Sequence, residues 1–249
     1  MIDLLPIRLE LLLLIIAAGL YISDVAQFLF INEALFVRKP RGRWIAYLPS
    51  RGIEITRRFV VFPMLFEPNC ATFRISWPVK KTEPDSSIDT VYAEINRKLK
   101  LLNPLSWISA LLFFQIFFAL PIVFVFFDFD FVIISSLIII YAQVILACLL
   151  LVMRRKSIGI GWRKVGSIIF ESLICLPYSI NIYRKASLFS IHYEMDLLTI
   201  DHALLSSEAL NEFRCDLVEI IDKQMAYADE DSSWFEALGK FRQRAKVQI

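Results

Sequence analysis

Three long apolar segments constrain this chain more than any other feature of its sequence. The hydrocarbon core of a bilayer is about 30 Å thick, and a helix needs about 20 apolar residues to cross it. Residues 11–37, 105–127 and 131–153 reach that length. The apolar fraction of the whole chain is 57%, above the roughly 45–50% of soluble domains. The sequence therefore predicts an α-helical integral membrane protein with three transmembrane helices.

The second and third apolar segments are almost contiguous. Only Asp128, Phe129 and Asp130 separate them, so residues 105–153 are expected to form a tight antiparallel transmembrane hairpin. A fourth segment, residues 167–182, is short, contains Glu171 and is broken by Pro177. These features favour a re-entrant or interfacial segment over a fourth crossing.

Lysine and arginine predict the orientation in the membrane. They are dense between Arg38 and Lys100 and again directly after residue 153, whereas the hairpin tip contains only acidic and apolar residues. By the positive-inside rule the two basic regions face the cytoplasm and the N-terminus lies outside. The first segment lacks a basic leader and a small-residue cleavage site, so we expect a retained span. The expected location is the plasma (inner) membrane, with most of the aqueous mass cytoplasmic.

Five regions follow from this pattern. Residues 1–37 are the first transmembrane helix, and residues 38–104 are a small α+β cytoplasmic loop. Strands are expected at 44–48, 52–56 and 72–77, and an amphipathic helix is expected from near Ser86 to the start of the second span at Pro104. The apolar run 59–66 is either a buried edge strand or a segment dipping into the membrane. Three further regions complete the chain. They are the hairpin at 105–153, a basic juxtamembrane and re-entrant or interfacial segment at 154–185, and a helical cytoplasmic tail at 186–249.

The tail contains two amphipathic helical patterns, starting near Ser206 or Ser207 and near Ser232. Their apolar faces are the expected partner-binding surface, with Leu210, Phe213, Leu217, Trp234, Phe235 and Leu238 as its residues. Basic residues near the end of the third span are expected to contact anionic lipid headgroups. They are Arg154, Arg155, Lys156, Arg163 and Lys164.

Polar residues inside apolar segments are costly and mark functional or interhelical contacts. The set is Asp24, Glu33, Gln115, Gln143 and Glu171. Asp24 and Glu33 are nine residues apart, which places them on opposite sides of one helix. We expect Asp24 to pack against a polar group of the hairpin, Gln115 or Gln143. An ion path is the alternative.

The two histidines lie close together, in residues 190–202. If residues 191–197 form a strand, His192, Glu194 and Asp196 share one face, and His202 follows closely. Nitrogen and oxygen ligands in this arrangement are compatible with a metal site. The simpler interpretation is a polar strand face, because alternation produces such faces routinely.

The function classes are narrowed mainly by motifs that the chain lacks. The sequence contains no GxSxG motif, no HExxH motif, no phosphate-binding loop and no cysteine–histidine pair at a catalytic spacing. We therefore expect no cofactor, and we favour a protein that is not an enzyme. The net charge of +2 gives no support for nucleic-acid binding. The expected function is a non-catalytic integral membrane subunit that anchors or scaffolds a protein complex, bound to lipids and to a protein partner or further copies of itself. The alternatives are an oligomeric pore or transport element and a membrane-bound metal-dependent enzyme.

Overall fold

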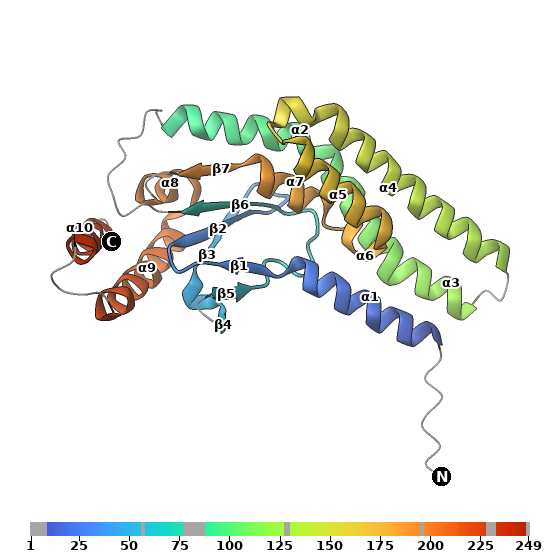
Figure 1. The fold of residues 1–249 in the computed structure, drawn as a ribbon, viewed down its shortest axis with the longest axis horizontal. Coiled ribbons are helices and arrows are strands. Elements are labelled where there is room, and N and C mark those ends of the chain that lie inside the picture. Colours follow the sequence, from blue (N-terminus) through green and yellow to red (C-terminus); the bar gives the residue numbers. More distant parts are fainter. Residues whose placement is uncertain are drawn as a thin grey trace, which may run out of the picture. The chain divides into compact units, whose positions relative to one another are not determined.

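The structure is a computed structural model that describes residues 9–55, 58–76, 88–126, 130–194, 197–227 and 233–247. The fold is mostly helical, with a smaller sheet region (Figure 1). The chain divides into two compact units. Unit 1 comprises Met1–Val25, Met64–Cys70 and Lys100–Ser190, and unit 2 comprises Ala26–Pro63, Ala71–Leu99 and Ile191–Ile249.

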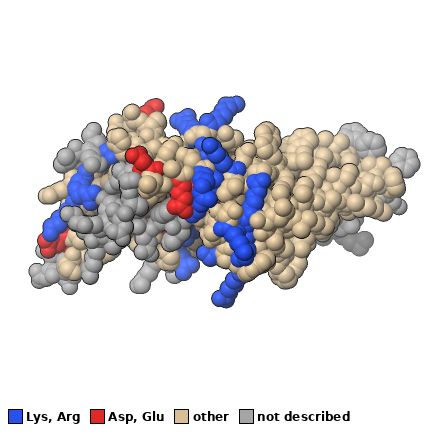
Figure 2. Space-filling view, turned by 90° about the horizontal axis from the view of Figure 1, so that it is seen from above, with Lys and Arg blue, Asp and Glu red and all other residues tan. Residues whose placement is uncertain are grey.

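Two helical stretches are long and apolar enough to span a membrane. They are Asp89–Phe124 and Phe131–Ile158, with mean hydropathies of 2.2 and 2.7 in their most apolar windows. Most of the residues in those windows are not buried by the rest of the protein. The core helices of a soluble domain would instead be mostly buried. A space-filling view shows a broad surface free of visible charge, bounded on one side by lysine and arginine (Figure 2). These features weakly support membrane association.

The first of these stretches is built from three helical elements. They are α2 (Ile88–Phe114), a π-helical turn at Gln115–Ala119, and α3 (Leu120–Phe126). We predicted that an amphipathic helix ends and a separate span begins at Pro104, but Pro104 lies inside α2. A proline inside a helix removes one backbone hydrogen bond and usually kinks or breaks the helix, yet α2 continues through Pro104 to Phe114.

The expected hairpin is present. α3 ends at Phe126, α4 (Asp130–Ile158) begins four positions later, and the two helices pack against each other. Two tip residues, Asp128 and Phe129, lie outside the described residues.

The predicted first span is wrong in its extent. α1 (Leu9–Val25) has 17 residues and ends before the polar part of the expected segment. Residues beyond it form β1 (Gln27–Leu29) and β2 (Glu33–Arg38). The aromatic and β-branched residues after Val25 favour strands. Counting apolar residues over 11–37 cannot distinguish one long helix from a helix that is followed by two strands.

The fourth apolar segment is not one crossing helix. It is divided into α5 (Trp162–Ile174) and α6 (Leu176–Ser179), which are followed by α7 (Ile182–Ser190). The 13 residues of α5 extend only about 20 Å. α5 buries Val165 and Ile168 on one side and exposes Phe170 and Ile174 on the other, the pattern of an amphipathic helix.

Unit 2 contains two small sheets. One has the order β3-β2-β6-β7 and the other β1-β5-β4, and β6–β7 is the parallel pair. The remaining strands are β3 (Trp44–Tyr47), β4 (Ile53–Ile55), β5 (Arg58–Val61), β6 (Ala71–Ser76) and β7 (His192–Glu194). The predicted strands at 44–48, 52–56 and 72–77 correspond to β3, β4 and β6. The run 59–66 contributes β5, which is the central strand of its sheet and not an edge.

The helices of unit 2 that follow β7 are α8 (Leu197–Leu204), α9 (Ser207–Tyr227) and α10 (Ser233–Val247). Aromatic rings join α9 to the four-stranded sheet. Phe36 stacks on Phe73 at 5.4 Å between ring centroids, Trp44 meets Phe73 edge-on at 5.3 Å, and Phe213 of α9 lies 5.9 Å from Phe36. Such pairs add to the hydrophobic gain of burying the rings.

Candidate functional site: an ion cluster centred on Lys185

The strongest polar constellation in unit 1 is centred on the ammonium group of Lys185. Its Nζ lies 2.6 Å from Oδ1 of Asp24 and 2.7 Å from Oε2 of Glu171. Asn181 donates a hydrogen bond of 2.9 Å from Nδ2 to Oδ2 of Asp24. The two ion pairs of Lys185 join α7 to α1 and to α5. Asn181, which directly precedes α7, adds a neutral hydrogen bond to α1.

The preceding residue, Arg184, holds a different segment. Its guanidinium donates to the carbonyl oxygens of Met64 and Glu67, the latter at 2.8 Å. Tyr21 of α1 donates to the carbonyl of Leu65 at 2.7 Å. The turn between β5 and β6 is thereby fastened to α1 and α7, and Met64 in that turn has a positive φ of 46°, an uncommon value for a residue other than glycine.

The contacts of Glu171 favour its charged form. Burial opposes ionisation of Glu171, but hydrogen bonds from Lys185 and Ser167 outweigh it, and the pKa of Glu171 lies below its usual value. The Lys185 ammonium also lies 4.9 Å from the ring centroid of Tyr178, within cation–π range. The arrangement suits a structural clamp.

The cluster corrects one expectation about Asp24. We predicted a contact with Gln115 or Gln143, whereas the carboxylate binds Lys185 and Asn181. A carboxylate in apolar surroundings needs a cation, but no local spacing in the sequence indicates that Lys185 is this cation.

Glu33 also differs from its expected place. It begins β2 in unit 2 and is not part of a membrane helix. Its Oε2 accepts a hydrogen bond of 3.0 Å from the Phe30 backbone and lies 3.4 Å from Arg74 on β6. This carboxylate closes the turn between β1 and β2 and pairs across the sheet.

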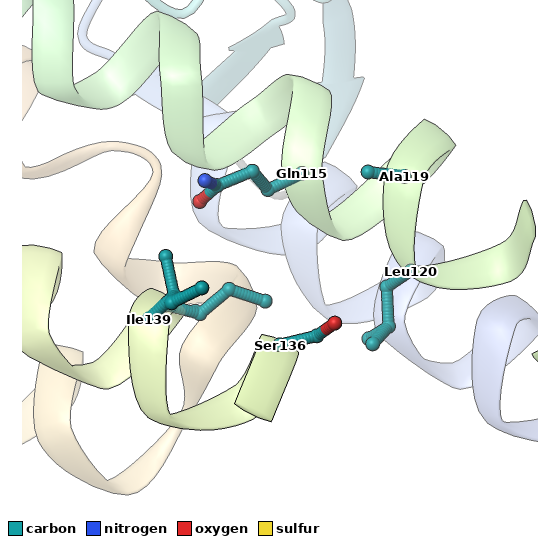
Figure 3. Close-up of a pocket in the computed structure, with 6 residues that line it drawn as sticks. Gln115, Ala119, Leu120, Ser136 and Ile139 are labelled. Atoms are coloured by element: carbon teal, nitrogen blue, oxygen red, sulfur yellow. The ribbon is translucent and has the colours of Figure 1, made fainter. Parts of the chain in front are cut away.

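A second feature of unit 1 is a mostly apolar pocket of about 100 Å³ at the hairpin. Figure 3 shows Gln115 facing the helix that carries Ser136 and Ile139. The lining residues are Gln115, Ala119, Leu120, Ser136, Ile139 and Ile140. The Ser136 hydroxyl donates to the Val132 carbonyl at 2.8 Å. Among the described residues, the side-chain oxygens of Gln115 and Gln143 are buried and have no hydrogen-bond partner.

Replacing Gln115 by leucine is expected to raise the thermal midpoint of the full chain in detergent. An unsatisfied buried acceptor costs about 1–3 kcal/mol, and leucine of similar size removes it. Differential scanning fluorimetry measures the change, with Ser135→Ala, an exposed hydroxyl on α4, as the matched control. A lower midpoint for the Gln115→Leu variant would mean that the oxygen has a partner in the intact protein.

The five basic residues predicted to contact lipid headgroups, at the end of α4 and the start of α5, differ in their surroundings. Arg154 donates to the carbonyl of Leu101, the Arg155 guanidinium lies 4.1 Å from the Trp162 ring centroid, and the Lys164 ammonium lies 5.1 Å from that of Phe189. Lys156, Arg163 and Lys164 are exposed. These three are the residues of the set most accessible to a lipid headgroup.

The metal hypothesis is not tested by the described side chains. β7 ends at Glu194, and α8 begins at Leu197, so the strand expected over residues 191–197 is shorter than predicted. Asp196 and the side chains of His192 and Glu194 lie outside the description, and His202 is exposed on α8. Among the histidine, cysteine and acidic residues that are described, no group of three could hold a metal ion.

The expected partner-binding face of the tail is largely covered. Four of its six residues are buried: Leu210, Phe213, Leu217 and Leu238. They contribute to the core of unit 2, so in this conformation they do not offer a docking face, which corrects that part of the prediction. Trp234 is exposed and Phe235 is half-buried.

A buried ion pair in unit 2 was not predicted. Arg214 of α9 donates from Nε to Oδ2 of Asp201 at 3.1 Å and from a terminal nitrogen to Oδ1 at 3.2 Å. Both side chains are almost fully buried, at 2% and 0% exposure. The bidentate geometry ties α8 to α9.

Comparison with protein-family models, curated proteins and solved structures yields no match.

Proposed function

We propose that the protein is a non-catalytic integral membrane subunit that anchors or scaffolds a protein complex. In this proposal α1, α2–α3 and α4 cross the plasma (inner) membrane, and α5 and α6 lie at its surface. Unit 2 is the cytoplasmic part and carries the contacts to a protein partner. The N-terminus lies outside, in agreement with the distribution of lysine and arginine.

The Lys185 cluster is the observation that carries this proposal. Ionisable groups in or near membrane helices serve either a transport path or the packing of the helices. Here one ammonium neutralises two carboxylates from separate helices at 2.6 and 2.7 Å. Groups held this firmly by one another favour a rigid anchor over an ion path, which would need charges able to exchange partners.

Trp234 is the residue we assign to partner contact. It belongs to the first turn of α10, is 42% exposed, and has the large apolar area typical of interface hot spots. Deleting the tail from Ser206 would remove buried residues of unit 2 and would confound docking with folding. A point substitution at an exposed residue avoids that problem.

The test is purification of the full chain in mild detergent at native expression level, followed by mass photometry and mass spectrometry. We expect a particle that contains this chain and a second protein at fixed stoichiometry. Trp234→Ala should weaken retention of that protein about ten-fold or more, since hot-spot substitutions cost at least about 2 kcal/mol. Tyr92→Ala, which removes a comparably exposed aromatic ring from α2, is the matched control.

Two results would contradict the proposal. Release of the chain from membranes by alkaline carbonate would exclude an integral anchor. A particle containing only copies of this chain, with ion flux in vesicles, would favour the oligomeric pore.

A further inference from the structure

The three-stranded sheet in unit 2 has one face that carries mainly apolar side chains and is largely uncovered by the described part of the chain. The uncovered face of a sheet in a soluble protein is normally polar. The strand register places Phe28, Val60 and Ile53 in one row on the apolar face, and Arg58 and Ile55 in the next row, two residues along each strand. Val60 on the central strand is buried, so the exposed part of this face is formed by Phe28, Ile53, Ile55 and Arg58. Phe30 extends the second row, because its ring lies 4.9 Å from the Arg58 guanidinium. The opposite face includes the buried residues Leu29 and Val61.

The exposure of this face is large. Ile53 and Ile55 are 64% and 51% exposed, and Phe28 and Phe30 are 49% and 46% exposed. In an antiparallel sheet with one buried face, the other face normally carries polar residues that meet water. An exposed apolar patch of this kind indicates an interaction surface.

Chain connectivity and composition indicate the occupant. Only Ala26 separates the end of α1 from β1, and three Cα steps of 3.8 Å keep Phe28 within about 11 Å of Val25. α1 itself exposes isoleucine and leucine side chains along its length. Aromatic rings beside a cationic group are typical of the boundary between lipid tails and headgroups.

We infer that the sheet face formed by Phe28, Phe30, Ile53, Ile55 and Arg58 lies on the membrane surface as a second, peripheral lipid contact. Its apolar side chains enter the upper acyl region, and the Arg58 guanidinium pairs with lipid phosphate. This inference rests on the proposed membrane anchor and adds to it. The contact restricts the orientation of the sheet relative to the membrane surface.

The experiment places a photoreactive benzoylphenylalanine at Ile53, and separately at Ile55, in the full chain. The protein is reconstituted into vesicles of phosphatidylcholine and phosphatidylglycerol, irradiated, and examined by intact mass spectrometry. Ile138, an exposed residue in the middle of α4, serves as the lipid-facing reference, and Tyr227, 92% exposed at the end of α9, serves as the water-facing reference. Resistance of unit 2 to limited proteolysis verifies that each labelled protein is folded.

We expect phospholipid adducts at positions 53 and 55 at least about five-fold above those at position 227, as for side chains buried in the headgroup boundary. Adducts to a second protein or to another copy of the chain would overturn the inference and assign the face to a protein interface. Yields no higher than at position 227 would also overturn it. Failure of the anchor is distinguishable, because position 138 would then give no lipid adduct, and the inference would fall with it.

Discussion

Substitution of Lys185 by methionine is expected to lower the thermal midpoint of the full chain in detergent by about 10 °C. Methionine preserves much of the side-chain volume but removes the ammonium. Among the contacts that the described residues make, the Asp24 carboxylate then keeps the hydrogen bond from Asn181. Breaking one partner of a buried pair costs about 3–5 kcal/mol because the remaining charge is uncompensated. Glu171 loses less, since its side chain is 39% exposed and water replaces part of the interaction.

A double substitution distinguishes charge from packing. Asp24→Asn in the Lys185→Met background removes the orphaned charge, so most of the lost midpoint should return. Arg163→Met, which removes an exposed cation from α5, should have little effect. If the double variant is as unstable as Lys185→Met alone, the lysine acts through its packing and not through the ion pair.

Substitution of Arg214 by methionine is expected to destabilise unit 2 by about 3–5 kcal/mol. The Asp201 carboxylate is fully buried, and without the guanidinium it loses two hydrogen bonds, of 3.1 and 3.2 Å. Pulse proteolysis of the full chain measures the change as a loss of protease-resistant protein at a lower urea concentration.

The companion double variant, Asp201→Leu with Arg214→Met, should recover most of that loss. Paired apolar replacements of a buried ion pair are often neutral or stabilising. Lys240→Met is the surface control, because its pair with Glu236 is exposed and such i,i+4 pairs contribute only about 0.3–0.5 kcal/mol. Equal effects for the Arg214→Met and Lys240→Met variants would contradict the assigned role of burial.

Sequence periodicity predicts the local elements of this protein well. The continuous apolar runs around Asp128 and Asp130 are sufficient to predict a hairpin, because length and proximity are local properties. The 3.6-residue period likewise locates α9 and α10. The same counting failed at Val25, where the chain remains apolar while its structure changes from helix to strand. The apolar content of a segment indicates that it is shielded from water. The period of its apolar residues, 3.6 for a helix and 2 for a strand, is what indicates its conformation.

The candidate site could not be located in this way, because its contacts join residues far apart in the chain. Asn181 binds Asp24, 157 positions earlier, and the neighbouring Arg184 binds carbonyl oxygens about 120 positions earlier. Sequence reasoning identified Asp24 and Glu171 as costly residues that need partners. It could not select Lys185, since no local spacing connects α7 to α1.

The separation of Asp24 from its partners has a consequence for biogenesis. Asn181 is made 157 residues after Asp24, which takes about 8–30 s at 5–20 residues per second. During that interval α1 carries an ionisable side chain whose partners do not yet exist. The ion pair of α1 must therefore await α7, whereas the hydrogen bond from Tyr21 to the Leu65 carbonyl can form much earlier.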